Sequence, residues 1–239
     1  MNKSPLLIVS LLLTFSFNYA QTLDIGIKGG INYNNIGDFY SKGGSIGVGV
    51  PDENFEAENE IGFQYGIYTQ INYNYFFIRP EVSFTSFKNS YPFPTKTAKW
   101  EAKQVDVPIL LGYNIYGPIS IFAGPVFSFI SDIEMEGWED TSYADPFTFN
   151  KSSTSISAGI LLDFGRVGID FRYQYGLTTV EEQRLDMIKT YNGYGVNLGD
   201  LLEYEPSQFM INIQINLFTI NDDTRNKKSS SDWRNHKNL

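Results

Sequence analysis

The sequence predicts an all-β protein: an eight-stranded, antiparallel, up-and-down transmembrane β-barrel. Three observations predict this fold: segments in which apolar and polar residues alternate, connections whose lengths alternate, and an N-terminus typical of an exported chain. A period of two indicates a strand with one apolar face, because a helix would spread the same residues around its circumference.

The first twenty residues have the three zones of a signal peptide. A polar start with Lys3 precedes an apolar run over residues 5–17 and a cleavage position after Ala20. That run is shorter than the roughly 20 residues of a membrane-spanning helix, and a retained N-terminal anchor is the alternative to cleavage. We expect a signal peptide over residues 1–20, a barrel over 21–218, and a polar, disordered periplasmic tail over 219–239.

Residues 61–75 show the alternation most clearly. Odd positions such as Ile61 and Phe63 are apolar or aromatic, whereas even positions such as Gly62 and Gln64 are glycine or amide. The segment can cross a bilayer when tilted, since about 9–11 residues suffice. The eight predicted strands lie around residues 25–34, 61–75, 78–85, 104–114, 119–129, 156–164, 167–178 and 209–217.

The connections alternate between tight turns and long polar stretches. Turns are predicted at residues 74–76, 116–118 and 165–166, and the other four connections are long. A barrel with periplasmic termini has short turns inside and long loops outside. We therefore expect both chain ends in the periplasm and four long loops at the cell surface.

The polar face of the strands is rich in glycine and carries charges of both signs. In a narrow eight-stranded barrel this face would crowd the interior, where unpaired charges are costly. We predict a salt-bridged interior that holds the barrel shut; an ion path or small-solute gate is the alternative. The predicted lumen charge network consists of Lys28, Arg79, Glu81, Asp106, Asp163, Asp170 and Arg172.

Aromatic residues make up 16% of the chain and gather at the predicted strand ends, as in the girdles of membrane barrels. The last strand is an alternating run that ends in an aromatic residue, like the C-terminal signal that the barrel-insertion machinery reads. The predicted periplasmic girdle is Tyr73, Tyr75, Phe76, Phe77, Tyr113, Tyr116 and Phe164, and the predicted assembly signal is Phe209, Ile211, Ile213, Ile215 and Phe218.

Short motifs carry a family resemblance over residues 22–218. They are Gly26-Ile27-Lys28-Gly29-Gly30-Ile31-Asn32-Tyr33, Arg79-Pro80-Glu81-Val82-Ser83-Phe84, Val105-Asp106-Val107-Pro108, Ala123-Gly124-Pro125 and Arg172-Tyr173-Gln174-Tyr175-Gly176-Leu177-Thr178. With these motifs the chain resembles the PorT-like family of small outer-membrane β-barrels of Bacteroidetes. The resemblance implies the barrel fold and the cell envelope but no single activity; the role of the founding member in protein secretion gives an accessory secretion role as an alternative.

The sequence lacks the residues that several kinds of chemistry require. The chain has no cysteine, and its single histidine, His236, lies in the predicted tail, so a serine–histidine hydrolase is not expected. The net charge of −9 does not suit nucleic acid. The glycine-rich residues 43–49 lack the lysine and helix of a phosphate cradle. We expect no enzyme and no cofactor.

Carboxylates gather in the predicted loops. They could hold Ca²⁺ or Mg²⁺, alone or against lipopolysaccharide phosphates, or they could simply be solvated. They are Asp52, Glu53, Glu56, Glu58, Glu60, Glu134, Glu136, Glu139, Asp140, Asp145, Glu181, Glu182, Glu203 and Glu205.

The sequence thus predicts a structural or surface-interaction barrel that acts through long acidic extracellular loops. The alternatives are a component of a secretion apparatus and a soluble lipid-binding barrel whose apolar face points inward. The expected partners are outer-membrane lipid and lipopolysaccharide, the barrel-insertion machinery, and a surface partner or secretion complex.

Overall fold

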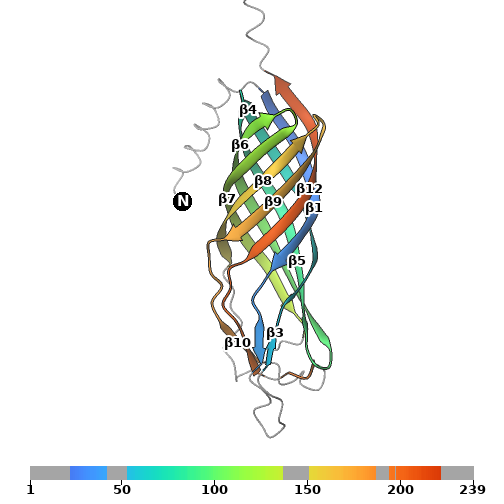
Figure 1. Cartoon of the computed structure of the whole chain (residues 1–239), viewed down its shortest axis with the longest axis vertical. Coiled ribbons are helices and arrows are strands. Elements are labelled where there is room, and N and C mark those ends of the chain that lie inside the picture. Colours follow the sequence, from blue (N-terminus) through green and yellow to red (C-terminus); the bar gives the residue numbers. More distant parts are fainter. Residues whose placement is uncertain (1–21, 42–52, 137–150, 187–193, 197, 222–239) are drawn as a thin grey trace, which may run out of the picture.

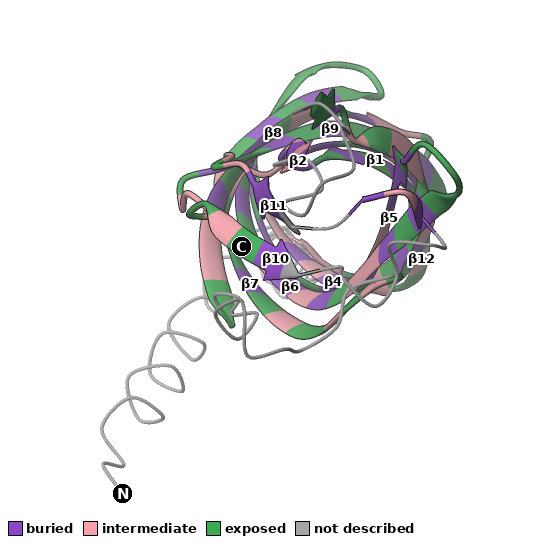
Figure 2. Cartoon of the chain, turned by 90° about the horizontal axis from the view of Figure 1, so that it is seen from below, coloured by how far each residue is buried: buried purple, intermediate pink, exposed green. Residues whose placement is uncertain are grey.

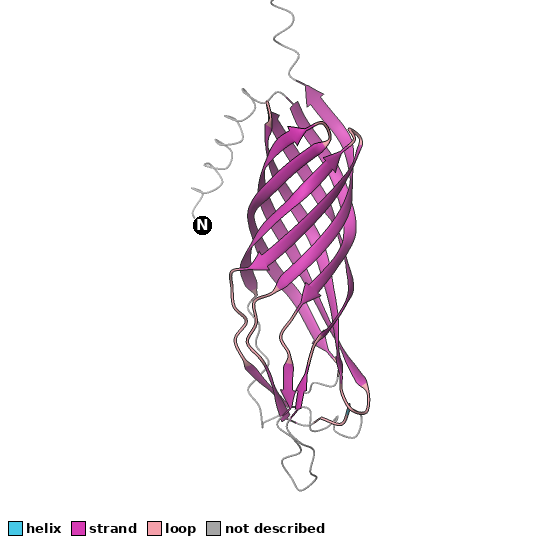
Figure 3. Cartoon of the chain, in the orientation of Figure 1, coloured by secondary structure: helices cyan, strands magenta, loops and turns pink. Residues whose placement is uncertain are grey.

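The computed structural model describes residues 22–41, 53–136, 151–186, 194–196 and 198–221. Strands make up most of these residues (Figure 3). Among them, no helix has the length and apolarity needed to cross a membrane. The predicted signal peptide, the glycine-rich stretch at 43–49, most of the predicted tail and His236 lie outside the described residues.

Eight long strands close into an antiparallel barrel, which confirms the predicted fold class (Figure 1). Each strand pairs with its neighbour along the chain, and β1 closes the barrel by pairing with both β12 and β4. Their bounds are β1 Thr22–Asn35, β4 Glu58–Tyr73, β5 Phe76–Pro92, β6 Thr97–Tyr116, β7 Ile119–Met135, β8 Ser152–Asp163, β9 Val167–Gly176 and β12 Ser207–Asn221.

The barrel is apolar outside and polar inside. Outward side chains such as Ile67 and Phe63 are 60% and 59% exposed, whereas Lys28, Glu81 and Arg172 are buried inside. Buried and exposed residues alternate along the strands (Figure 2). The outer face therefore suits lipid. The soluble barrel with an apolar interior is wrong for this chain, because its interior carries ions.

Three tight turns join the strands at the end of the barrel where β1 begins and β12 ends (Figure 1). Asn74 and Gly117 have φ of 54°, and Gly165 has φ of 89°. This left-handed conformation is open to glycine and tolerated by asparagine, so these residues permit the sharp reversals. The predicted turn positions are where the chain turns.

The opposite end differs from the prediction of four long loops. β5 and β6 remain paired as far as Pro92 and Thr97, so residues 93–96 are their whole connection. β6 and β7 remain paired to Trp100 and Met135. The hydrogen bonds between these strands continue beyond the outward apolar residues of the barrel, which we call the apolar band. Residues that the sequence predicted as loops are therefore strand.

The β1–β4 and β9–β12 connections form a second, four-stranded sheet in the order β10–β11–β2–β3. Viewed along the barrel, β2, β10 and β11 lie within the outline of its wall (Figure 2). We call this sheet, together with the ends of β5, β6 and β7 that pack against it, the loop unit. Its strands are β2 Phe39–Ser41, β3 Glu53–Phe55, β10 Gln183–Asp186 and β11 Leu198–Leu201.

β12 continues past the predicted end of the barrel at residue 218. Thr22, Leu23 and Asp24 of β1 pair with Asn221, Ile220 and Thr219, so the strand ends at Asn221. A bulge opposite Ile25 and Gly26 inserts Leu217 and turns Phe218 outward, where it is 65% exposed.

We predict that Ile67→Arg destabilises the folded barrel in lipid vesicles by about 2–4 kcal/mol, the cost of an arginine on the lipid face near the bilayer centre. Tyr116→Arg, beside a tight turn at the interface, is the control and should cost at most about 1 kcal/mol. Urea unfolding monitored by heat-modifiable gel mobility measures both. Equal effects would contradict the assignment of the outer face.

Candidate functional site

A layer of ion pairs crosses the interior of the barrel. Glu81 on β5 accepts hydrogen bonds from Lys28 on β1 and from both terminal nitrogens of Arg172 on β9, at 3.0 and 3.2 Å. β5 and β9 are four places apart in the eight-stranded ring, so the Arg172–Glu81 pair joins opposite walls. All three side chains are almost completely buried.

Three further residues surround Arg172 and Glu81. Asp170, two residues before Arg172, accepts hydrogen bonds from its guanidinium, and Asn212 on β12 donates to the same carboxylate at 3.1 Å. Arg79 lies 4.0 Å from Glu81. The structure thus brings together five of the residues predicted for the charge network: Lys28, Arg79, Glu81, Asp170 and Arg172.

Asp106 and Asp163 lie apart from this layer. Asp106 accepts hydrogen bonds from Thr85, Gln104 and Ser128 at 2.5–2.7 Å, so neutral groups and not a cation surround it. Asp163 lies at the turn end, where it accepts a hydrogen bond from the backbone of Gly165 at 2.8 Å. They share the lumen face with the network, but their positions along the strands place them at other depths.

Aromatic and aliphatic side chains pack on the turn side of the ion layer. The guanidinium of Arg79 lies 4.7 Å from the ring centre of Tyr68, and that of Arg172 lies 5.1 Å from Phe122. Such cation–π contacts stabilise a guanidinium that has left water. Sequence patterning missed this apolar cluster of four inward residues, Phe77, Leu110, Phe122 and Leu161.

Phe77 does not belong to the periplasmic girdle. It is 5% exposed, and its ring lies against Gly112, the residue paired with it on β6, where a Cβ would come within 2.0 Å of the ring. Phe76 points to lipid, so strand alternation turns Phe77 inward. The other predicted girdle residues are exposed: Tyr73, Tyr75, Phe76, Tyr113, Tyr116 and Phe164.

The residues predicted as the assembly signal lie on β12. Phe209, Ile213, Ile215 and Phe218 are exposed on the outer face, and Ile211 is half-buried. They are therefore part of the apolar band.

The loop unit has a core of its own. Phe93 packs against Phe39, Phe55 and Tyr91, with ring centres 5.2, 5.1 and 5.8 Å apart. The Tyr91 hydroxyl donates to the carbonyl oxygen of Gly37 at 2.7 Å. The buried members of this core are Ile36, Phe39, Phe55, Tyr91, Phe93, Ala98, Trp100, Leu185, Tyr194, Val196 and Leu201.

Tyr91 in this core and Tyr204, which packs against it, both have a raised pKa. Burial raises the pKa of Tyr204 to about 12, and burial, with smaller effects from Tyr204 and Asp38, raises the pKa of Tyr91 well above its ordinary value. Both hydroxyl groups therefore stay protonated to a higher pH than an exposed tyrosine.

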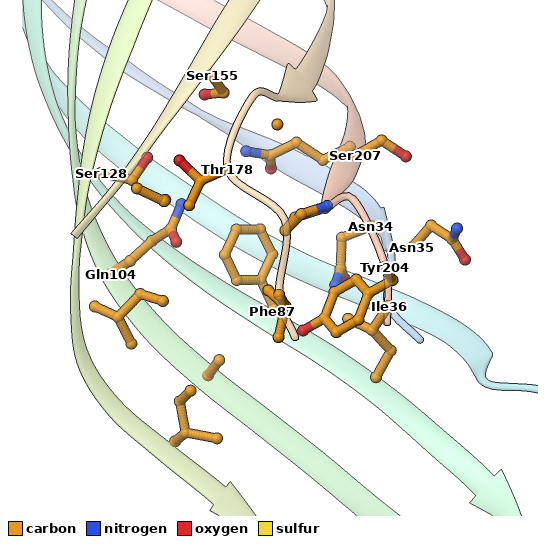
Figure 4. Close-up of a pocket in the computed structure, with 18 of the residues that line it drawn as sticks. Asn34, Asn35, Ile36, Phe87, Gln104, Ser128, Ser155, Thr178, Tyr204 and Ser207 are labelled. Carbon is orange, nitrogen blue, oxygen red and sulfur yellow. The ribbon is translucent and has the colours of Figure 1, made fainter. Parts of the chain in front are cut away.

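A cavity of about 110 Å³ lies between the loop unit and the polar interior of the barrel. Residues from both parts line it, including Asn34, Phe87, Gln104 and Tyr204, which Figure 4 shows around the central space. The sequence pattern could not reveal it, because its walls come from segments that meet only in the closed barrel.

The predicted acidic loop residues are dispersed. Glu58 belongs to β4 and Glu134 to β7, and Glu136 forms an ion pair with Lys96 at 3.7 Å. Among the described residues, no group of three or more His, Cys, Asp or Glu is placed to hold a metal ion. Asp52, Glu139, Asp140 and Asp145 lie outside the described part of the chain.

Residues 19–182 match the family described as the outer membrane protein beta-barrel domain. The chain belongs to this family. An outer-membrane location follows from the family and agrees with the apolar band on the barrel. No curated protein matches the sequence of this outer-membrane barrel.

Solved structures of other outer-membrane proteins are similar to this barrel at low identity. Neisserial surface protein A is 13% identical, with a TM-score of 0.44, over 80% of this chain and 96% of that one. Ail, the attachment invasion locus protein of Yersinia pestis, is 14% identical, with a TM-score of 0.39, over 82% and 99%. The outer membrane protease OmpT from Escherichia coli is 8% identical, with a TM-score of 0.33, over 82% and 96%.

We predict that Glu81→Gln lowers the free energy of unfolding of the barrel by about 3–5 kcal/mol, because it leaves buried cations without their carboxylate. The control is Glu101→Gln, which removes an exposed pair with Lys88 at 3.3 Å and should cost at most about 1 kcal/mol. Urea unfolding in vesicles measures both. Adding Lys28→Met to Glu81→Gln should restore part of the loss; a double variant less stable than Glu81→Gln would contradict the ion layer.

Proposed function

We propose that this outer-membrane protein is a closed structural barrel that presents the loop unit at the cell surface as an interaction surface. The observation that carries the proposal is the combination of an ion layer joining opposite barrel walls with an apolar core in the loops. A conduit would need an open interior, whereas a surface that recognises a partner benefits from a fixed shape.

The charge pairs support a closed interior. The side chains of Lys28, Glu81 and Arg172 are at most 2% exposed, and the apolar cluster lies beside them. In an eight-stranded barrel the interior is just wide enough for side chains. A salt-bridged plug, with no flow of ions, is therefore the function that we propose for the lumen network.

The lengths of the connections support the orientation. The tight turns, the start of β1 and the end of β12 lie on one side of the barrel, and the loop unit lies on the other. Bacterial barrels keep short turns in the periplasm and longer loops outside. We propose that residues 1–20 direct export, that both termini are periplasmic, and that the barrel-insertion machinery reads the outward face of β12.

The proposed partners divide between lipid and protein. The apolar band would contact membrane lipid, and exposed charges beyond it, such as Lys103 and Lys99, would lie near lipopolysaccharide. A surface partner would bind the loop unit. The accessory role in a secretion apparatus, suggested by the resemblance to PorT-like barrels of Bacteroidetes, would instead need contacts on the periplasmic side.

The orientation predicts a labelling pattern, because the chain has no native cysteine. In intact cells, a membrane-impermeant maleimide should label Thr95→Cys, in the β5–β6 connection, and not Arg166→Cys, in the β8–β9 turn. Both should be labelled once the outer membrane is broken. Labelling of Arg166→Cys alone in intact cells would reverse the orientation.

The surface role predicts separable defects. Leu185→Asp places a charge in the core of the loop unit, where Leu185 is 1% exposed. It should leave the heat-modifiable mobility of the barrel unchanged, expose the loop unit to added protease on intact cells, and abolish crosslinking of a surface partner through Thr95→Cys. Glu203→Gln, at an exposed position, is the control.

Crosslinking distinguishes the two roles. Partners captured through Arg166→Cys and unaffected by Leu185→Asp would indicate the secretion role. Ion-conducting steps of the wild-type protein in planar bilayers would contradict the closed barrel.

A further inference from the structure

The cavity beneath the loop unit is not needed for a closed barrel or for an exposed surface. It has about 110 Å³ of space and two chemically different walls. A close-packed protein would fill such a space unless something else occupies it.

The wall formed by the loop unit and the strand ends is apolar. Ile36 and Trp100 belong to the core of the loop unit, and Phe87 and Tyr204 add aromatic rings (Figure 4). The ring of Phe87 approaches the central space from β5, and the ring of Tyr204 approaches it from the connection between β11 and β12. This wall suits a flat apolar group.

The wall formed by the barrel strands is polar and incompletely bonded. The side-chain oxygens of Asn34, Ser155 and Gln208 are buried and, within the described part of the chain, have no hydrogen-bond partner. All three residues line the cavity. Two of these atoms are amide carbonyl oxygens, which accept hydrogen bonds, and buried acceptors are rarely left unsatisfied. A small shift of these side chains toward the cavity would let an occupant with N–H or O–H groups satisfy them.

The lining residues carry no formal charge. Asp106 lies next to this wall, but Gln104 and Ser128, which line the cavity, donate to its carboxylate. An ion of either sign would lose its water without gaining an opposite charge, so the site favours a neutral molecule.

We propose that this cavity is a binding site for a small, uncharged molecule with one aromatic or other flat apolar group and at least one N–H or O–H donor. The apolar group would pack on Phe87, Trp100 and Tyr204, and the donors would meet Asn34, Ser155 and Gln208. The space is comparable to that of an engineered cavity of about 150 Å³ that admits benzene. The site does not depend on a macromolecular partner binding the loop unit.

Three probes of the same shape test the charge and donor requirements. Benzamide is neutral and carries N–H donors, benzoate is an anion without donors, and benzamidinium is a cation. With the full-length protein in detergent, ligand-observed NMR should give saturable binding of benzamide in about the millimolar range, as small fragments bind. Benzoate and benzamidinium should bind at least about tenfold more weakly, a difference expected for an unpaired buried charge.

Matched variants distinguish binding of the probe in the cavity from its partition into detergent. Ala102→Phe fills a lining position, and Gln208→Leu removes one acceptor with little change in volume; each should weaken benzamide binding at least about tenfold or abolish it. Ala158→Phe is the same alanine-to-phenylalanine change at an exposed position on the outer face, and it should leave benzamide binding unchanged. Heat-modifiable mobility shows whether each variant folds, and Gln208→Leu decides the test if Ala102→Phe does not fold.

Three results would overturn the proposal. The first is equal benzamide signals in the wild-type and Gln208→Leu proteins, which would mean partition into detergent. The second is benzoate or benzamidinium binding as well as benzamide. The third is no saturable binding of any probe, which would leave water as the occupant.

Discussion

The structure depends on one constraint: lipid offers no hydrogen bonds to a peptide backbone, so a sheet that crosses a bilayer must have no edge. β1 meets this constraint by pairing with β12 on one side and with β4 on the other. The first and last strands of the barrel are therefore brought side by side. The three tight turns and the pairing of Leu23 with Ile220 follow from the same need to keep backbone groups bonded as far as the interface.

Closing the sheet around eight strands inverts the usual protein. Apolar side chains such as Ile67 face outward, and the narrow interior receives the polar face. Charges placed there have lost most of their water, so each needs a partner within reach. Glu81 lies between Lys28 and Arg172, and Asp170 orients Arg172. The pairs hold opposite walls together, which is why we assign the interior a structural role.

Beyond the apolar band, the same strands return to the ordinary arrangement. The outward residues Lys88 and Glu101 form an ion pair, while Tyr91 and Trp100 on the same two strands pack inside the loop unit. Water surrounds this end, so burial of apolar groups again stabilises the structure. The cavity lies where the polarity changes along β5 and β6, between the polar interior of the barrel and the apolar core of the loop unit.

The sequence by itself determined the central parts of the eight barrel strands, where the tight turns lie and which face most residues of these strands take, because these properties depend on local alternation and on residues such as Asn74 and Gly165. It placed Lys28, Glu81 and Arg172 on one face but could not show that they meet, since their side chains converge from three strands that are distant in sequence. The tertiary structure alone decided that Asp106 stands apart and that Phe93 joins the connections into one packed unit. Those outcomes depend on the register and depth of the closed barrel, where contacts form between residues that no local pattern relates.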